Sequence, residues 1–265
     1  LTGFNGRCDA VYITNEGDEP EQDNEKMPEF RRRIRGITIE DFPEEFDLIV
    51  AGGGIAGICT ALSAIRSGVK TLLIQDRGVL GGCNSSEVRV SLGGQPHAGN
   101  YPRLGDIVDE IAPIMGSGGT YPAEYYEDAR KKMAFELSPR DLWHIELNTA
   151  VVGVEREENR ITAVICRSCV TGKETRYRAK LFSDCTGDAV LARMMGAETM
   201  YGTEPRERLG ESLAHDKARD EVMGQSVLWL TKDAGHPCGF PDVDFGIEIN
   251  EDNCLYVKGG DWEWE

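Results

Sequence analysis

"DLIVAGGGIAGICTALSAIRSG", residues 47–68, is the stretch that decides the fold of this chain. Three consecutive glycines follow an apolar run and precede a segment in which Ile58, Ala61, Leu62 and Ile65 recur at helical spacing. Glycine inside a regular element costs roughly 0.5–1 kcal/mol. The cluster therefore predicts a backbone that turns tightly, or that approaches a ligand closely, between a buried strand and a helix.

The residues after this stretch complete a βαβ unit. Gly68 is a stop signal for the helix, and "KTLLIQ" at residues 70–75 is a second apolar strand. Amphipathic patterns then predict two helices, near residues 104–111 and 123–137. Alternating patterns predict the strands of an antiparallel meander, within residues 143–157, 160–168 and 174–182. A strand, a glycine turn and a short helix follow at residues 181–198, so the pattern is α/β.

Spacing within the glycine loop indicates a dinucleotide. Gly52, Gly54 and Gly57 satisfy G-x-G-x-x-G, in which the first glycine permits the turn, the second lets a pyrophosphate approach, and the third allows close packing. The helix start offers free N–H groups to that anion. The second strand ends at Gln75 and Asp76, roughly 20 residues later, where a ribose-binding side chain belongs. The alternative is a βα turn that is merely compact.

Three stretches in this order resemble a known group of proteins: "AGGGIAG", "LLIQDRGVLGGCNSSEVRV" and "LFSDCTGDAVLARMMGAE". They resemble the bacterial two-dinucleotide-binding-domain flavoproteins, FAD-dependent oxidoreductases related in fold to the flavin domains of glutathione reductase and fumarate reductase. The resemblance covers residues 46–196. It implies a three-layer ββα FAD/NAD(P)-binding, Rossmann-like domain with an antiparallel β-meander. It also implies FAD as the cofactor, and hydride or electron transfer between the flavin and a small-molecule substrate.

The same resemblance implies which residues hold FAD, whereas it leaves the catalytic residues and the substrate unknown. The pyrophosphate set is the glycine loop and the start of its helix: Gly52, Gly54, Ile55, Ala56 and Gly57. The set at the adenosine ribose is Gln75, Asp76 and Arg77. The loop that leads the ribityl chain to the flavin contains Gly81, Gly82, Asn84 and Ser85. Ala150 meets adenine through its backbone, and the residues that close over the pyrophosphate are Thr186, Gly187 and Asp188.

Two rival functions share parts of this pattern. An NAD(P)-dependent oxidoreductase has the same glycine fingerprint but does not require the "CTGDA" segment after a meander. A non-catalytic flavin-binding fragment would hold the cofactor without turnover. The cofactor that is released from the protein distinguishes the first rival, and a reduction assay distinguishes the second.

The chain of 265 residues divides into three parts on composition. Residues 1–43 contain a strand-like stretch at 3–14 and a polar, acidic linker that ends near the basic run "RRRIR", which we expect to be solvated and ion-paired. Residues 44–198 form the FAD-binding domain. Residues 199–265 begin a substrate or cap domain that is cut short, so we expect the flavin site to be incomplete at the C-terminus.

Net charge limits the partners. At −17 the chain repels nucleic acid and anionic membranes at long range, so we expect neither as a partner. No apolar run approaches the roughly 18 residues that would span a bilayer. The chain starts at Leu1 without an initiator Met. We therefore leave the compartment open, with the cytoplasm slightly favoured over export, and leave the oligomeric state open as well.

Cysteine and histidine signals are weaker. Cys83 stands where disulfide reductases of this superfamily begin a redox motif, but Val88 occupies the place of the second cysteine, so a dithiol relay is not expected. Cys166 and Cys169 have zinc-knuckle spacing without a second ligand pair, and we expect no metal site. His97, in a Gly/Pro-rich loop, is either an acid/base group or an ordinary loop histidine.

Glu87 and Arg89 leave two alternatives open. They belong to the motif of the family, which places them near the isoalloxazine. The other interpretation is that they form an ion pair that fixes the loop.

Overall fold

The computed structural model describes residues 13–15, 19, 21–23, 26–114, 121–222 and 233–239. It consists of two units, residues 1–223 and residues 224–265, and the first contains every helix and strand of the described residues. Its strands are β1 (Ile39–Ala51), β2 (Thr71–Ile74), β3 (Trp143–Glu146), β4 (Thr149–Glu157), β5 (Arg160–Ser168) and β6 (Glu174–Asp184). Its helices are α1 (Met27–Arg35), α2 (Ile55–Arg66), α3 (Asp106–Ile111), α4 (Ala123–Tyr126), α5 (Ala129–Glu136), α6 (Val190–Met194) and α7 (Arg206–Leu209). Short 3-10 turns are Gly82–Asn84, Pro102–Gly105 and Arg140–Leu142.

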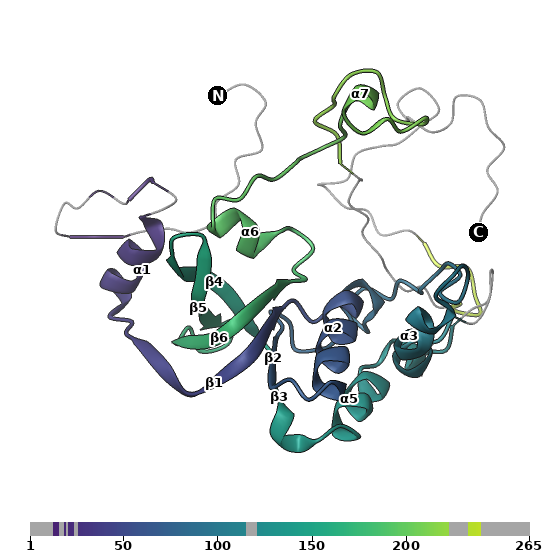
Figure 1. The fold of residues 1–265 in the computed structure, drawn as a ribbon, viewed down its shortest axis with the longest axis horizontal. Helices are drawn as coiled ribbons and strands as arrows, with labels where there is room; N and C mark the ends of the chain where they lie inside the picture. Colours follow the sequence, from purple (N-terminus) through teal and green to yellow (C-terminus); the bar gives the residue numbers. More distant parts are fainter. Residues whose placement is uncertain are drawn as a thin grey trace. The chain divides into compact units, whose positions relative to one another are not determined.

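The strands form a six-stranded sheet in the order β3-β2-β1-β6-β5-β4. The first four are parallel to one another, whereas β5 is antiparallel to both β6 and β4. β6 belongs to both halves: it pairs with β1 along its whole length, and its first residues, Glu174–Arg178, also pair with β5 in the meander. Figure 1 shows β1 curving along β6 from the meander into the parallel strands. The α/β, Rossmann-like fold with a meander is therefore confirmed.

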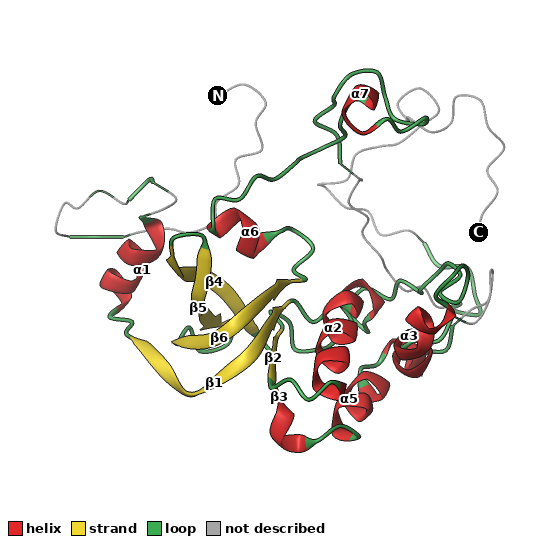
Figure 2. Ribbon diagram, viewed as in Figure 1, coloured by secondary structure: helices red, strands yellow, loops and turns green. Residues whose placement is uncertain are grey.

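Two apolar clusters hold the layers together. Side chains alternate along β1, so Val50 joins the cluster under the helices while Ile49 joins the cluster under the meander. β2 divides in the same way, with Leu73 on the helix side and Leu72 on the meander side. Figure 2 shows α2, α3 and α5 gathered on one side of β1 and β2, with β4 and β5 on the other. Burial on both faces explains why these strands read as continuous apolar runs.

Two expected elements are each divided in two. The strand expected within residues 143–157 is interrupted at Asn148, whose φ of +51° turns the chain. Its first part, β3, is an outer parallel strand beside β2, and only β4 belongs to the meander. The helix expected over residues 123–137 is interrupted at Glu127, where ψ is 151°. Pattern alone did not reveal either break because apolar residues stand on both sides of each one.

The segment expected to be a linker contains ordered structure. α1 buries Phe30, and the expected ion pairing of the basic run includes Arg32, which pairs with Glu174 at the start of β6. Glu174 is 0% exposed and also accepts hydrogen bonds from Arg167. A buried carboxylate needs such partners. They join α1 to the meander, and β1 begins at Ile39, before the expected boundary at residue 43.

The domain boundaries at 43 and 198 remain predictions. The strand expected over residues 3–14 lies outside the described residues except for its last two positions. Most of the cap domain expected over residues 199–265 lies outside them as well.

Candidate functional site

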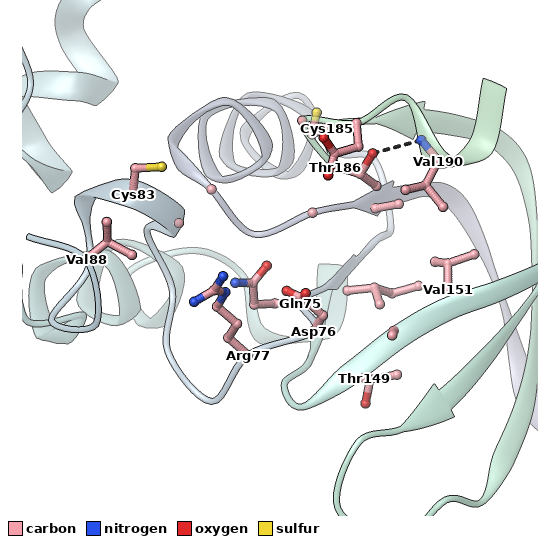
Figure 3. Close-up of a pocket in the computed structure, with 18 residues that line it drawn as sticks. Gln75, Asp76, Arg77, Cys83, Val88, Thr149, Val151, Cys185, Thr186 and Val190 are labelled. Atoms are coloured by element: carbon pink, nitrogen blue, oxygen red, sulfur yellow. Dashed lines mark hydrogen bonds between the residues drawn. The ribbon is translucent and has the colours of Figure 1, made fainter. Parts of the chain in front are cut away.

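A cavity of about 480 Å³ lies at the carboxyl ends of β1, β2 and β6, beside the start of α2. This is the edge at which open parallel sheets bind ligands. The predicted site residues that line it are Gly52, Gly54, Gln75, Asp76, Arg77, Gly82, Ala150, Thr186, Gly187 and Asp188. The predicted site residues that do not line it are Ile55, Ala56, Gly57, Gly81, Asn84 and Ser85. Figure 3 shows the labelled lining side chains arranged around this space.

The lining also includes residues that the sequence did not single out as cofactor-binding. They are Ala51, Ile74, Cys83, Val88, Thr149, Val151, Cys185 and Val190. Most of them adjoin a predicted residue in the chain. The signal that could have found them is position alone, because the residues at the ends of neighbouring parallel strands meet at one edge.

Gly52 and Gly57 are required by close packing of the loop itself. Gly52 has a φ of +102°, and a Cβ there would lie 2.2 Å from the carbonyl oxygen of Cys185. A Cβ on Gly57 would lie 1.8 Å from the carbonyl oxygen of Gly52. Neither position can hold a side chain without moving backbone, so these glycines form the tight turn between β1 and α2.

Gly54 is different, because nothing in the protein crowds it. A Cβ there would meet only the Cα of Gly82, at 4.0 Å, and φ is −69°, which any residue adopts. Gly54 lines the cavity directly before the first N–H groups of α2, which have no partner within the helix. The loop therefore has room for a ligand atom where a side chain would otherwise stand.

Gln75 supports the glycine loop from β2. It is 4% exposed, its Oε1 accepts the Gly53 N–H at 2.7 Å, and its Nε2 donates to the Val79 carbonyl at 3.3 Å. The amide thus retains one N–H hydrogen for a ligand, since Nε2 carries two. Asp76 and Arg77 are exposed and extend the same wall of the cavity, as Figure 3 shows.

A second glycine turn touches the first. The N–H of Gly81 donates to the Gly53 carbonyl at 2.8 Å, and a Cβ on Gly82 would lie 3.1 Å from the Cα of Gly54. Gly81 and Gly82 both have positive φ, +119° and +60°. Glycine at these positions lets the two turns stand side by side, so Cys83 reaches the cavity wall.

Glu87 and Arg89 do not pair with each other. Glu87 pairs with Arg77 at 3.0 Å, and Arg89 donates to the Ser86 carbonyl at 3.4 Å. The ion pair that Glu87 makes therefore joins the end of β2 to the loop that follows Cys83. Val88 lies on the cavity wall near Cys83, in the place where a resolving cysteine would stand.

The turn after β6 is organised by Asp184. Its carboxylate accepts hydrogen bonds from the Thr186 N–H and hydroxyl and from the N–H groups of Leu191 and Ala192. Burial acts to raise the pKa of Asp184, but these hydrogen bonds hold that pKa below its ordinary value. The Thr186 hydroxyl oxygen accepts the Val190 N–H at 3.0 Å, the dashed line in Figure 3. Asp184 and Thr186 thus cap α6, which leaves the exposed Asp188 on the cavity wall.

The weaker signals lie elsewhere. His97 binds the Pro102 carbonyl and the Asp109 carboxylate, which together raise its pKa, and it does not line the cavity. Cys166 is buried in β5, whereas Cys169 is exposed beyond the end of that strand. Within the described ranges, no three His, Cys, Asp or Glu side chains gather closely enough to hold a metal ion. The helices in those ranges are all too short or too polar to cross a membrane.

Comparison with known proteins gives the family. The sequence model described as "FAD dependent oxidoreductase" matches residues 47–246. The chain belongs to this family. Its cofactor is accordingly FAD, and flavin-dependent redox chemistry is confirmed as the general activity of the family, whereas the glutathione reductase or fumarate reductase subclass remains a prediction.

Relatives of this FAD dependent oxidoreductase are distant and differ in activity. The tRNA uridine 5-carboxymethylaminomethyl modification enzyme MnmG of Lactobacillus delbrueckii subsp. bulgaricus is 30% identical over 64% of this chain and 29% of that enzyme. The aklavinone 12-hydroxylase DnrF of Streptomyces peucetius is 27% identical over 64% of this chain and 37% of that enzyme. The chain thus spans about a third of the length of such relatives. Because MnmG modifies tRNA, the expected lack of a nucleic-acid partner stays a prediction.

Solved structures show a partial likeness to this chain. THI4 of Thermovibrio ammonificans is 14% identical with a TM-score of 0.45, over 68% of this chain and 72% of that one. The glycerol-3-phosphate dehydrogenase of Bacillus halodurans, solved with FAD, is 17% identical with a TM-score of 0.40, over 58% of this chain and 37% of that one. At this identity the likeness concerns the fold and says nothing about the substrate.

Proposed function

We propose that this chain carries the FAD site of an oxidoreductase that exchanges hydride or electrons with a small-molecule substrate. The observation that carries the proposal is Gly54, which lines the cavity at the helix start and has no protein atom nearer than 4.0 Å to the point where a Cβ would stand, so that a pyrophosphate has room there. The flavin supplies the redox chemistry when bound, and the protein binds and orients it.

Each wall of the cavity suits a different part of FAD. The pyrophosphate would lie against Gly52, Gly54 and the N–H groups of Ile55, Ala56 and Gly57. The free N–H of Gln75, with Asp76 and Arg77, would hold the adenosine ribose, and the Ala150 backbone would meet adenine. The turn containing Gly81, Gly82, Asn84 and Ser85 would guide the ribityl chain, and the residues closing the site would be Thr186, Gly187 and Asp188.

The residue at the end of β2, Gln75, is neutral where a ribose site ordinarily has a carboxylate. A carboxylate is the ordinary ribose acceptor at this strand end, and here a neutral amide occupies the place while a carboxylate, Asp76, follows it. The amide is needed where it is, because Oε1 accepts the Gly53 N–H and so fixes the glycine loop. Asp76 is then the side chain that would accept from the ribose hydroxyls.

The test is the identity of the nucleotide that copurifies with the full-length protein. Heat-released supernatant should contain FAD by chromatography, at close to one per folded chain. Finding NAD(P) instead would favour the NAD(P)-dependent rival, and a folded sample with no nucleotide would overturn the proposal. Bound FAD that dithionite reduces, but that exchanges electrons with no small molecule tested, would favour the non-catalytic rival.

A further inference from the structure

Lys131 is a buried lysine, 0% exposed, whose ammonium makes no hydrogen bond to the described residues. Its neighbours on α5, Ala134 and Phe135, belong to the apolar cluster under the helices. Lys132, the next residue, is half-exposed and pairs with Asp128 at 2.9 Å. Since an unpaired buried ammonium is costly, and methionine would fill the same space, its position requires an explanation.

The end of Lys131 lies against the second glycine turn. Its Cε is 2.8 Å from the point where a Cβ of Gly81 would stand, and the carbonyl oxygen of Asn84 is 2.3 Å from that same point. The N–H of Leu80 donates to Asp128 at 3.4 Å, so the start of α5 contacts the turn a second time. Only glycine at position 81 leaves room for this approach.

The Gly81–Asn84 turn contacts both the cavity and Lys131. Gly82 and Cys83 line the cavity, whereas Lys131 does not line it and approaches Gly81. Asn84 has a second unpartnered group on the same turn: it is 1% exposed, its Nδ2 donates to the Val90 carbonyl at 2.9 Å, and its Oδ1 has no partner among the described residues. The Lys131 ammonium, a donor, and the Asn84 Oδ1, an acceptor, thus both lie at the Gly81–Asn84 turn, and both lack a partner among the described residues.

We propose that Lys131 is a positioning residue of the flavin end of the site: a buried ammonium that supports the Gly81–Asn84 turn and favours reduction of the FAD bound beside it. This proposal rests on the proposed function, which places the flavin beside that turn. Reduction adds negative charge to the flavin. A buried cation against this turn stabilises that charge, because charges interact strongly in a medium of low dielectric constant.

The surroundings of Lys131 affect its charge in two ways. Burial lowers its pKa, and the carboxylate of Asp128 opposes that fall. A reduced, more negative flavin would act in the same direction as Asp128. The lysine and the flavin therefore stabilise each other's charged forms, which a purely apolar support would not do.

The experiment compares Lys131→Met with Lys132→Met in the full-length protein loaded with FAD. Methionine keeps the volume and removes the charge. We expect the Lys131→Met protein to have a more negative two-electron potential, with reduced FAD bound about tenfold less favourably relative to oxidised FAD, a shift of about 30 mV. Its unfolding temperature should stay equal or rise, since a buried charge without a hydrogen bond to the described residues is removed. Lys132→Met should leave the potential unchanged.

Lys131→Gln repeats the test with a polar neutral side chain, should the methionine variant not hold FAD. A wild-type potential in either neutral variant overturns the proposal, and so does an equal shift in Lys132→Met. Lys131→Arg restores the charge and should return the potential toward that of the wild type; a potential as negative as that of Lys131→Met would also overturn it. Wild-type protein without FAD would instead contradict the proposed function, so the two failures are distinguishable.

Discussion

At the scale of single residues, glycines of similar appearance serve different physical purposes. Gly52 and Gly57 have no room for a side chain. A Cβ on Gly52 would overlap the carbonyl of Cys185, and a Cβ on Gly57 would overlap the carbonyl of Gly52. Gly54 has room for a side chain, because the nearest protein atom to a Cβ there would be the Cα of Gly82, at 4.0 Å. A substitution at the first two should therefore damage folding, whereas a substitution at Gly54 should damage only binding.

We predict that Gly54→Val removes FAD and leaves the fold intact. The backbone at Gly54 is extended, which suits a β-branched residue, and the isopropyl group would occupy the place of the pyrophosphate. The dissociation constant for FAD should rise at least about tenfold, which corresponds to a loss of about 1.4 kcal/mol of binding free energy, and FAD content per folded chain should fall. Circular dichroism should match the wild type.

Gly93→Val is the matched control for this prediction, since a Cβ there meets nothing within 4 Å and the residue does not line the cavity. It should retain FAD. Gly57→Ala should instead lower the unfolding temperature, because its Cβ would overlap the Gly52 carbonyl. Full FAD content in Gly54→Val would show that the glycine loop is only a compact turn.

A second prediction separates Asp188 from Cys83. Asp184 and Thr186 already cap α6, so Asp188→Ala should weaken FAD binding about 2–10-fold, the value of one hydrogen bond, with little effect on stability. Cys83→Ser should keep both FAD binding and reduction by dithionite, because Val88 stands where a resolving thiol would be needed. Equilibrium dialysis and stopped-flow spectroscopy measure these effects.

Asp184→Ala is the comparison for stability, with an expected loss of roughly 0.5–2 kcal/mol from the missing cap. Loss of substrate-driven flavin reduction in Cys83→Ser, with FAD still bound, would make that thiol catalytic and contradict our interpretation of the loop.

At the scale of elements, α1 is attached to the meander through one buried carboxylate. Glu174 accepts from Arg32 at 2.5 Å and from Arg167 at 2.6 Å. Burial acts to raise the pKa of Glu174, but the two guanidinium groups hold that pKa below its usual value. A lowered folded pKa stabilises the protein above the unfolded pKa, and this contribution disappears as the pH falls through the folded value.

We therefore predict that Arg32→Met lowers the free energy of unfolding by roughly 1.5–3 kcal/mol at neutral pH, the contribution of a hydrogen bond to a charged group. The difference from the wild type should persist above the ordinary glutamate value of about 4.3 and shrink below it, as Glu174 becomes protonated. Urea denaturation across this pH range measures it. Arg33→Met, on the exposed side of α1, is the control; an equal loss in both variants would show that helix propensity, not the ion pair, is responsible.

At the scale of the whole molecule, the sequence predicted the features that depend on neighbouring residues better than the features that depend on long-range contacts. The glycine loop, both strands around it and the turn after β6 are specified by neighbours in sequence, and the sequence located all of them. The ion pair from Arg32 to Glu174 joins residues 142 positions apart, so composition around Arg32 indicated only a linker. The break at Asn148 depends on which edge of the sheet is free, which no local pattern encodes.

The candidate site likewise has features that the sequence predicted and features that it did not. Its position at the strand ends followed from the spacing of Gly52, Gly54 and Gly57. The bracing role of Gln75 and the capping role of Asp184 did not, because both depend on which backbone N–H groups happen to face a side chain in three dimensions. Lys131 was hidden for a related reason: a lysine within a charged helix is usually solvated, and nothing in its neighbourhood of the sequence shows a glycine turn above it.

The pairing of β1 with β6 also determines when the protein can be completed during synthesis. Asp41 and Arg176, which pair across these strands, lie 135 residues apart. At about 5–20 residues per second, a ribosome needs on the order of ten seconds to deliver the second strand after the first. Throughout that interval the edge of β1 that β6 will cover presents unpaired backbone N–H and C=O groups, which can pair with another chain and promote aggregation. FAD cannot shorten the delay, because one wall of its cavity follows β6.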